Sequence, residues 1–99
     1  MRRGTTPTHY FKTKVDLTGA TEMFITYEQE GKKVVEKSIN DITIEPEQLT
    51  VKLTQTDTLA FSTLGEVEIQ CRAKMPGGAA LASNIIKRPV GKILKEGVI

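Results

Sequence analysis

One histidine and one cysteine are the residues of this chain best suited to nucleophilic chemistry. His9 and Cys71 are each the single residue of their type among 99 residues, and a cysteine activated by a histidine is a common nucleophile. Cys71 lies between Ile69 and Ala73 in a stretch that alternates apolar and polar residues. We therefore expect it on a buried face, where thiols are usually inert. One histidine and one cysteine also cannot form a conventional zinc site, so these residues predict no catalytic centre and no metal.

Carboxylates are the second group that could carry chemistry. A glycosidase needs two carboxyl groups roughly 5–10 Å apart across a cleft, but no spacing in this chain distinguishes such a pair. The acidic run 41–47 lacks the alternating Asp, Asn and Gly of a calcium loop, so it is only a weak calcium signal. The eight glycines form neither a dinucleotide-binding motif nor a Walker loop. We therefore expect neither an enzyme nor a bound cofactor.

The charges are sorted into blocks along the chain, although the net charge is only +2. Residues 1–14 hold four basic residues and no acid, residues 16–68 hold eleven acids and four lysines, and residues 72–95 hold six basic residues and no acid. Such an asymmetry concerns partners rather than fold. Because the first and last strands of a sandwich often lie close together, we expect the two basic ends to merge into one basic edge, with an acidic face elsewhere.

These blocks supply the candidate docking residues. The predicted basic edge contains Arg2, Arg3, Lys12, Lys14, Arg72, Lys74, Lys87 and Arg88. The predicted acidic face contains Glu28, Glu30, Glu36, Glu45 and Glu47. Opposite patches on different surfaces favour a head-to-tail contact between copies, which closes into a ring. The alternative is ordinary solubilising charge, with lysines that guard strand edges. Nucleic-acid binding is not expected, because Tyr10 and Phe11 beside Lys12 are the one cluster of aromatic with basic residues and the net charge is only +2.

The elements that must position these residues are short strands. Apolar residues alternate with polar ones over 9–17, 23–28, 49–54 and 66–74, which is typical of strands with one buried face. Glu30-Gly31-Lys32 predicts a hairpin turn, and residues 75–78 predict a second one, with a return strand over 79–88. Thr54 with Asp57 three residues later predicts one helical turn within 54–61.

About seven short strands and no long amphipathic helix predict an all-β fold, a single antiparallel β-sandwich of immunoglobulin-like architecture. A small barrel is the alternative. We expect an extended N-terminal arm over 1–8, the sandwich over 9–94 and a C-terminal tail over 95–99. Arg2 and Arg3 are not followed by an apolar core, so no secretory signal is expected, and no apolar run reaches the roughly 20 residues of a membrane span.

Several segments resemble small uncharacterised prophage proteins of Gram-positive gut bacteria. The resemblance covers nearly the whole chain, and its most specific parts are the opening residues 1–8 and Leu53-Thr54-Gln55. Further matches are 25–29 with 31–32, 51–55 with 58–59, 67–70 and 81–83. The strand layout is also loosely similar to the N-terminal β-domain of siphophage upper-baseplate proteins, although this chain stops before their helical and receptor-facing parts.

The resemblance implies a phage-derived structural or assembly module of the tail or baseplate, which docks to other phage structural proteins. It implies synthesis in the host bacterial cytoplasm, with the virion as a further location. The alternative function is a carbohydrate-binding module on the same fold. The chain has no Trp, so the platform for a sugar would consist of Tyr10, Phe24 and Tyr27.

Overall fold

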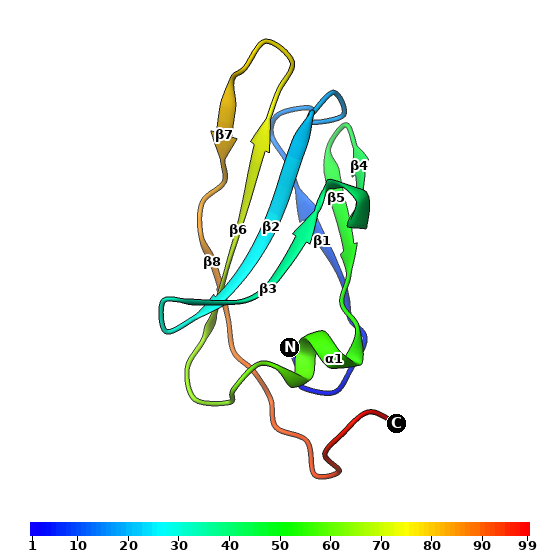
Figure 1. Cartoon of the computed structure of the whole chain (residues 1–99), viewed down its shortest axis with the longest axis vertical. Helices are drawn as coiled ribbons and strands as arrows, with labels where there is room; N and C mark the ends of the chain where they lie inside the picture. Colours follow the sequence, from blue (N-terminus) through cyan, green and yellow to red (C-terminus); the bar gives the residue numbers. More distant parts are fainter.

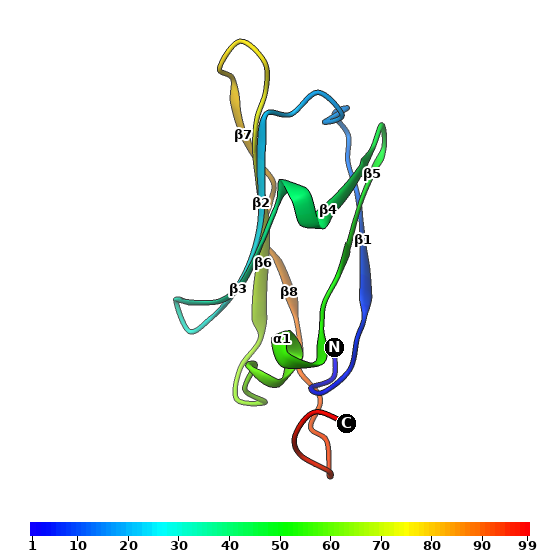
Figure 2. The same cartoon turned by 45° about the vertical axis from the view of Figure 1, so that its right-hand side comes forward.

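Two antiparallel sheets lie one over the other in the computed structural model, which describes residues 1–99 (Figures 1 and 2). The molecule is elongated and measures 47 × 26 × 17 Å. In spatial order, the three-stranded sheet contains β1 (Thr8–Lys12), β5 (Gln48–Lys52) and β4 (Ile42–Glu45). The five-stranded sheet contains β3 (Lys32–Ser38), β2 (Glu22–Gln29) and β6 (Val67–Lys74), followed by β7 (Ala80–Ala82) and β8 (Ile86–Arg88), which both pair with β6.

The core forms where the inner faces of the two sheets meet. Met23, Ile25 and Tyr27 alternate along β2 and are at most 1% exposed, and Leu49 and Val51 of β5 face them from the other sheet with the same burial. Burial of each such side chain contributes roughly 1.5–3 kcal/mol. The period-two pattern of these strands therefore fixes which face of each sheet is inside, and the predicted all-β, antiparallel fold is confirmed.

Local sequence signals place the turns and the helix. Glu30 and Gly31 both have positive φ, 52° and 75°, as a type I′ hairpin turn between β2 and β3 requires. The α1 helix (Gln55–Leu59) begins after Thr54, whose hydroxyl accepts from the Asp57 N–H at 3.1 Å while the Asp57 carboxylate accepts from the Thr54 N–H at 2.8 Å. The predicted hairpin and helical turn are therefore confirmed. A short 3₁₀ helix, η1 (Ile39–Asp41), links β3 to β4.

Two strands are shorter than the sequence predicts. The expected first strand over 9–17 ends at Lys12, which pairs with Gln48, the first residue of β5. No partner strand continues beyond that point, because the chain turns between β4 and β5. The expected return strand over 79–88 is divided into β7 and β8, which pair with β6 in registers that differ by one residue. The total is therefore eight strands rather than about seven.

The first seven residues lie against the helix and the C-terminal segment at one end of the molecule (Figure 1). The Gly91 N–H donates to the Met1 carbonyl at 2.7 Å, and the Arg3 N–H donates to the Gly91 carbonyl at 3.1 Å. The hydroxyl of Thr58, which is 0% exposed, donates to the Thr5 carbonyl at 2.8 Å and accepts from the Thr5 N–H at 3.1 Å. One helical side chain thus satisfies both backbone groups of an N-terminal residue.

We predict that Thr58→Val lowers the free energy of unfolding by about 1–3 kcal/mol, because it leaves the partly buried N–H and carbonyl of Thr5 without their hydroxyl partner. Urea denaturation followed by circular dichroism measures this change. Thr56→Val is the matched control, because Thr56 lies in the same helix and is exposed. Equal stabilities of the two variants would contradict the structural role of the Thr58 hydroxyl.

Candidate functional site

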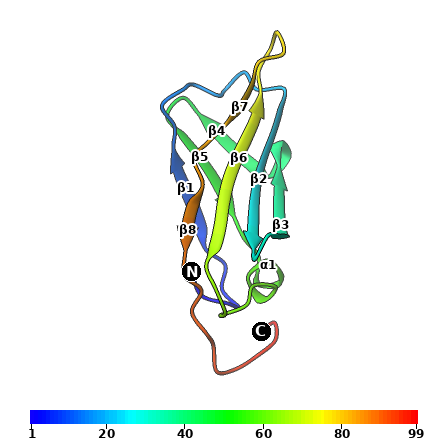
Figure 3. The same ribbon diagram turned by 90° about the vertical axis from the view of Figure 1, so that its left-hand side faces the viewer.

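A groove of about 570 Å³ opens between the two sheets on the side where β1, β7 and β8 are the outermost strands. Figure 3 looks toward this side of the molecule. Eleven of the sixteen lining residues are hydrophobic, so an apolar surface faces solvent here. Phe11 lines it from one sheet, and Ile69, Cys71, Leu81 and Ile86 line it from the other. The candidate site is this groove, which lies between strands rather than on a charged surface.

The groove exists because one sheet is wider than the other. Beyond β6 the five-stranded sheet continues with β7 and β8, whereas the three-stranded sheet ends at β1. Leu81 pairs with the buried Ala73 and is nevertheless 38% exposed, because it lines the open groove. Val15, just beyond the end of β1, also lines the groove and is 54% exposed. Each of these side chains would be covered by one more strand beside β1.

The outer edge of β1 has no partner strand. At the two ends of its ladder with β5, the Thr13 N–H donates to the Glu47 carbonyl at 2.9 Å and the Leu53 N–H donates to the Pro7 carbonyl at 3.0 Å. Hydrogen-bonded pairs alternate with non-bonded pairs along antiparallel strands. Every second residue of β1 therefore directs its N–H and carbonyl away from β5. These residues are Thr8, Tyr10 and Lys12.

On the opposite side of the groove, a β-bulge separates β7 from β8. The Ser83 N–H donates to the Cys71 carbonyl at 2.9 Å, and the Ser83 hydroxyl accepts from the Cys71 N–H at 3.0 Å. The Gln70 side-chain amide also donates to the Ser83 carbonyl at 2.9 Å. The serine hydroxyl thus takes the place of a backbone acceptor for β6. The pairing register with β6 differs by one residue on the two sides of this serine, and the Ile85 side chain is 53% exposed. Bulges of this kind are typical of sheet edges.

The groove is basic rather than acidic. Lys12 and Lys14 line it, and none of its lining residues is acidic. The side-chain oxygen of Thr13, another lining residue, is buried without a hydrogen-bond partner. Burial raises the pKa of the Cys71 thiol. The groove therefore offers apolar walls, two ammonium groups and one unsatisfied hydroxyl.

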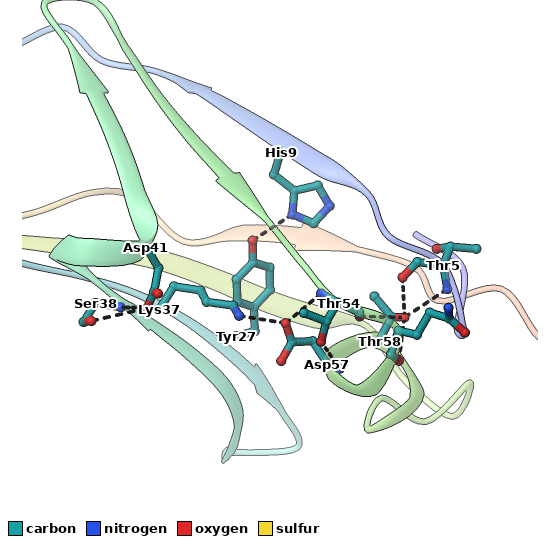
Figure 4. Close-up of polar contacts among 10 residues, drawn as sticks. Thr5, His9, Tyr27, Lys37, Ser38, Asp41, Thr54, Asp57 and Thr58 are labelled. Atoms are coloured by element: carbon teal, nitrogen blue, oxygen red, sulfur yellow. Dashed lines mark hydrogen bonds and ion pairs between the residues drawn. The ribbon is translucent and has the colours of Figure 1, made fainter. Parts of the chain in front are cut away.

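A polar contact closes the space between the sheets beyond the groove. His9 Nδ1 of β1 lies 2.7 Å from the Tyr27 hydroxyl of β2 (Figure 4). The centre of the Tyr27 ring lies 6.0 Å from that of the Phe61 ring. Burial lowers the pKa of His9, and the positive N-terminus and Arg88 lower it further. Burial raises the pKa of Tyr27, and the nearby Asp57 carboxylate adds to this effect. The neutral imidazole is thus the form that the fold favours.

An ion pair joins the helix to the wider sheet nearby (Figure 4). Lys37 Nζ of β3 lies 2.7 Å from the Asp57 carboxylate of α1, and both side chains are at most 20% exposed. Burial raises the pKa of Asp57, but hydrogen bonds from Lys37 and Thr54 outweigh this effect, so the pKa lies below its usual value. Asp57 is therefore used in holding the helix, and it does not face the groove.

The structure separates the predicted basic edge into three groups. Arg2 donates to the Lys92 carbonyl at 2.6 Å, and Arg3 forms a salt bridge with Glu96 at 2.6 Å, so both hold the C-terminal segment. Lys12 and Lys14 lie at the groove. Arg72, Lys74 and Lys87 lie on the outer face of the wider sheet, and Arg88 of the edge strand β8 lies close enough to His9 of β1 to lower the pKa of that imidazole. Arg72 and Lys74 therefore do not face the lysines at β1, whereas β8, with Lys87 and Arg88, is an edge strand on the same side of the molecule as β1.

The predicted acidic residues also divide between the two sheets. Glu28 and Glu36 lie on the outer face of the five-stranded sheet, where Lys33 pairs with Glu28 across the strands and lies 2.8 Å from Glu36. Glu30 is in the hairpin turn that follows β2. In the other sheet, Glu45 is the last residue of β4 and Glu47 lies in the turn between β4 and β5. Acidic and basic side chains are therefore interspersed on the outer face, where Glu22 also pairs with Lys74.

The other residues that the sequence indicated have different surroundings. His9 contacts Tyr27, whereas Cys71 lies in the groove and packs against the core, so the two have different partners. Of the three aromatics of the predicted sugar platform, Tyr27 is 0% exposed, and Tyr10 and Phe24 lie on different sheets. These aromatics do not form one face.

The groove was not predicted from the sequence. The available signal was the polar segment 1–8, because it lacks the alternating apolar residues of a further strand that could lie beside β1 and complete the narrower sheet. No group of three or more His, Cys, Asp or Glu side chains is arranged to hold a metal ion. No helix has the length and apolar character needed to cross a membrane. Comparisons of the chain with protein families, with curated proteins and with solved structures found no match.

We predict that the free energy of unfolding falls as the pH drops below about 6.5, the ordinary pKa of histidine, and that His9→Gln removes this part of the pH dependence. Stability falls with falling pH because the His9 pKa is lower in the folded protein than in the unfolded chain. The unfolded chain therefore binds the proton first as the pH falls, and this favours unfolding. Urea titrations of both proteins at pH 7.5 and 5.5 measure the difference. Since His9 is the only histidine, an equal pH dependence in both would contradict the burial of its neutral form.

Proposed function

We propose that this protein is a structural or assembly module that acts by docking to another protein through the groove between its sheets. The single observation that supports this most is an apolar groove beside an unpaired strand edge. Clefts lined mostly by apolar side chains are typical binding sites, and a free strand edge is a template for pairing with another chain. Catalysis has no part in this proposal, because the polar groups near the groove already have structural partners or are isolated.

We further propose that the fold is an immunoglobulin-like sandwich. Support comes from the strand order, because β4-β5-β1 opposite β3-β2-β6-β7 corresponds to D-E-B opposite C′-C-F-G of that architecture. The short helix between β5 and β6 occupies the connection between E and F. In this correspondence the missing element is strand A, the neighbour of strand B. The groove would then lie where strand A is absent.

The phage origin of the partner rests on the sequence resemblance alone. The opening residues 1–8 and Leu53-Thr54-Gln55 resemble small prophage proteins, and this implies tail or baseplate proteins as partners. We expect synthesis in the host bacterial cytoplasm and incorporation into the virion by docking. Charge would then set the rate and register of association more than its affinity. A ring of copies, the homo-oligomer that the charge blocks suggest, is the competing form of assembly.

We predict that Leu81→Glu weakens docking while leaving the fold intact. The purified protein is titrated against each tail and baseplate protein encoded beside its gene, and binding is measured by biolayer interferometry. Leu81 lines the groove and is already 38% exposed, so a carboxylate there costs little in the free protein but must be desolvated in the complex. We expect affinity to fall about tenfold or more, which is 1.4 kcal/mol.

Leu64→Glu is the matched control, because Leu64 is 75% exposed and does not line the groove. It should bind as the unchanged protein does. If no structural protein binds, or if both variants bind equally well, docking through the groove is refuted. Light scattering of the same samples over a salt series reports whether copies associate with each other instead.

A further inference from the structure

We propose that the groove receives an extended segment of a partner protein, which adds as a strand to the free edge of β1 and carries alternating apolar and acidic residues. This inference rests on the proposed docking function and names its mode and the chemistry of the partner. In such β-augmentation, main-chain hydrogen bonds supply affinity and pockets for alternate side chains supply specificity. Both parts are present on this side of the molecule.

The backbone of β1 supplies the first part. Thr8, Tyr10 and Lys12 direct their N–H and carbonyl groups away from β5, and successive outward groups lie two residues apart, roughly 6.5–7 Å. An added strand has outward groups at the same spacing, so three consecutive outward residues of β1 can pair with it. The exposed edge is thus long enough for a short strand.

The groove supplies the second part. Side chains of neighbouring strands project to the same side of a sheet, and Phe11 and Thr13 of the narrower sheet both line the groove. Alternate side chains of a strand beside β1 must therefore project into the groove, toward Ile69, Cys71 and Leu81. They would cover the apolar surface that the three-stranded sheet leaves open.

Charge selects among the possible occupants. Lys12 and Lys14 line the groove and no acidic residue does, so a segment with carboxylates beside its apolar residues is favoured. A second copy of this chain fits less well, because two β1 edges would bring four lysines together. The exposed apolar residues near the C-terminus lie next to Lys92 and Lys95, with Glu96 as the one acid among them. Edge lysines thus oppose self-association and leave an acidic partner as the occupant.

The test uses two synthetic peptides and the ¹⁵N-labelled full chain. One peptide alternates valine with glutamate, and the other alternates valine with lysine at the same length. We expect the glutamate peptide to bind and to slow hydrogen exchange of the Tyr10 and Lys12 amides by about tenfold or more, with chemical-shift changes at Cys71 and Leu81. The lysine peptide should not bind. Failure of the glutamate peptide to bind at millimolar concentration, or shifts confined to β3 or β4, would overturn the inference.

Strand addition is tested separately by removing single hydrogen bonds. Tyr10→Pro deletes an outward N–H that the ladder with β5 does not use, and proline is tolerated at such edge positions. We expect it to weaken peptide binding by about tenfold or more, whereas Tyr10→Val, which keeps the N–H, binds as before. The same test can be made without changing the protein, with two peptides N-methylated on their odd-numbered or on their even-numbered residues. Only one of the two sets has N–H groups that face β1, so one methylated peptide should lose binding and the other should not. Equal binding by the two methylated peptides would refute pairing with β1.

These outcomes distinguish the inference from the docking function on which it rests. If the peptides fail but Leu81→Glu still weakens binding of a partner protein, the groove docks that partner without strand addition. If Leu81→Glu leaves partner binding unchanged, docking through the groove itself is refuted.

Discussion

The inner face of the wider sheet extends beyond the strands that cover it, and the other features of this molecule follow from that mismatch. Opposite β5 the two sheets bury a dense core, in which Ile25, Leu49 and Val51 are at most 1% exposed. Beside β1 no strand continues the narrower sheet, so apolar side chains that the pattern directs inward reach solvent. The burial that stabilises the fold comes from the covered part, and the docking that we propose uses the part left open.

Two features of the strand edges beside the groove, lysines and a bulge, are typical of edges that resist aggregation. Lysines on the β1 edge repel another copy of the same edge, and the bulge around Ser83 interrupts the opposite edge. At the far end of the sheets, Arg2 and Arg3 tie the first residues to the C-terminal segment, so the N-terminal segment is not available to fill the groove. The groove is thus open in the single chain, and on the proposed account its edges disfavour unspecific pairing.

Sequence alone predicted the parts of this structure that depend on local rules. The alternation of residues 66–74, the Glu30-Gly31 turn and the Thr54–Asp57 capping box each identify their own element, because the energies involved act over a few residues. The groove could not be predicted in this way, since it depends on which strands are outermost in each sheet. The same reason separates Lys12 from Arg72, because the layers of the fold, and not the order along the chain, decide which charges share a face.

The labelling rate of Cys71 in the native protein tests the open groove most directly. Cys71 is the only thiol and lines the groove, although burial raises its pKa and slows its reaction. A small thiol reagent should therefore label the folded protein at a rate proportional to reagent concentration and faster than global unfolding, measured in parallel by a denaturant jump. Labelling that waits for global unfolding, at a rate independent of reagent concentration, would show that the sheets are closed over Cys71 and would contradict this account.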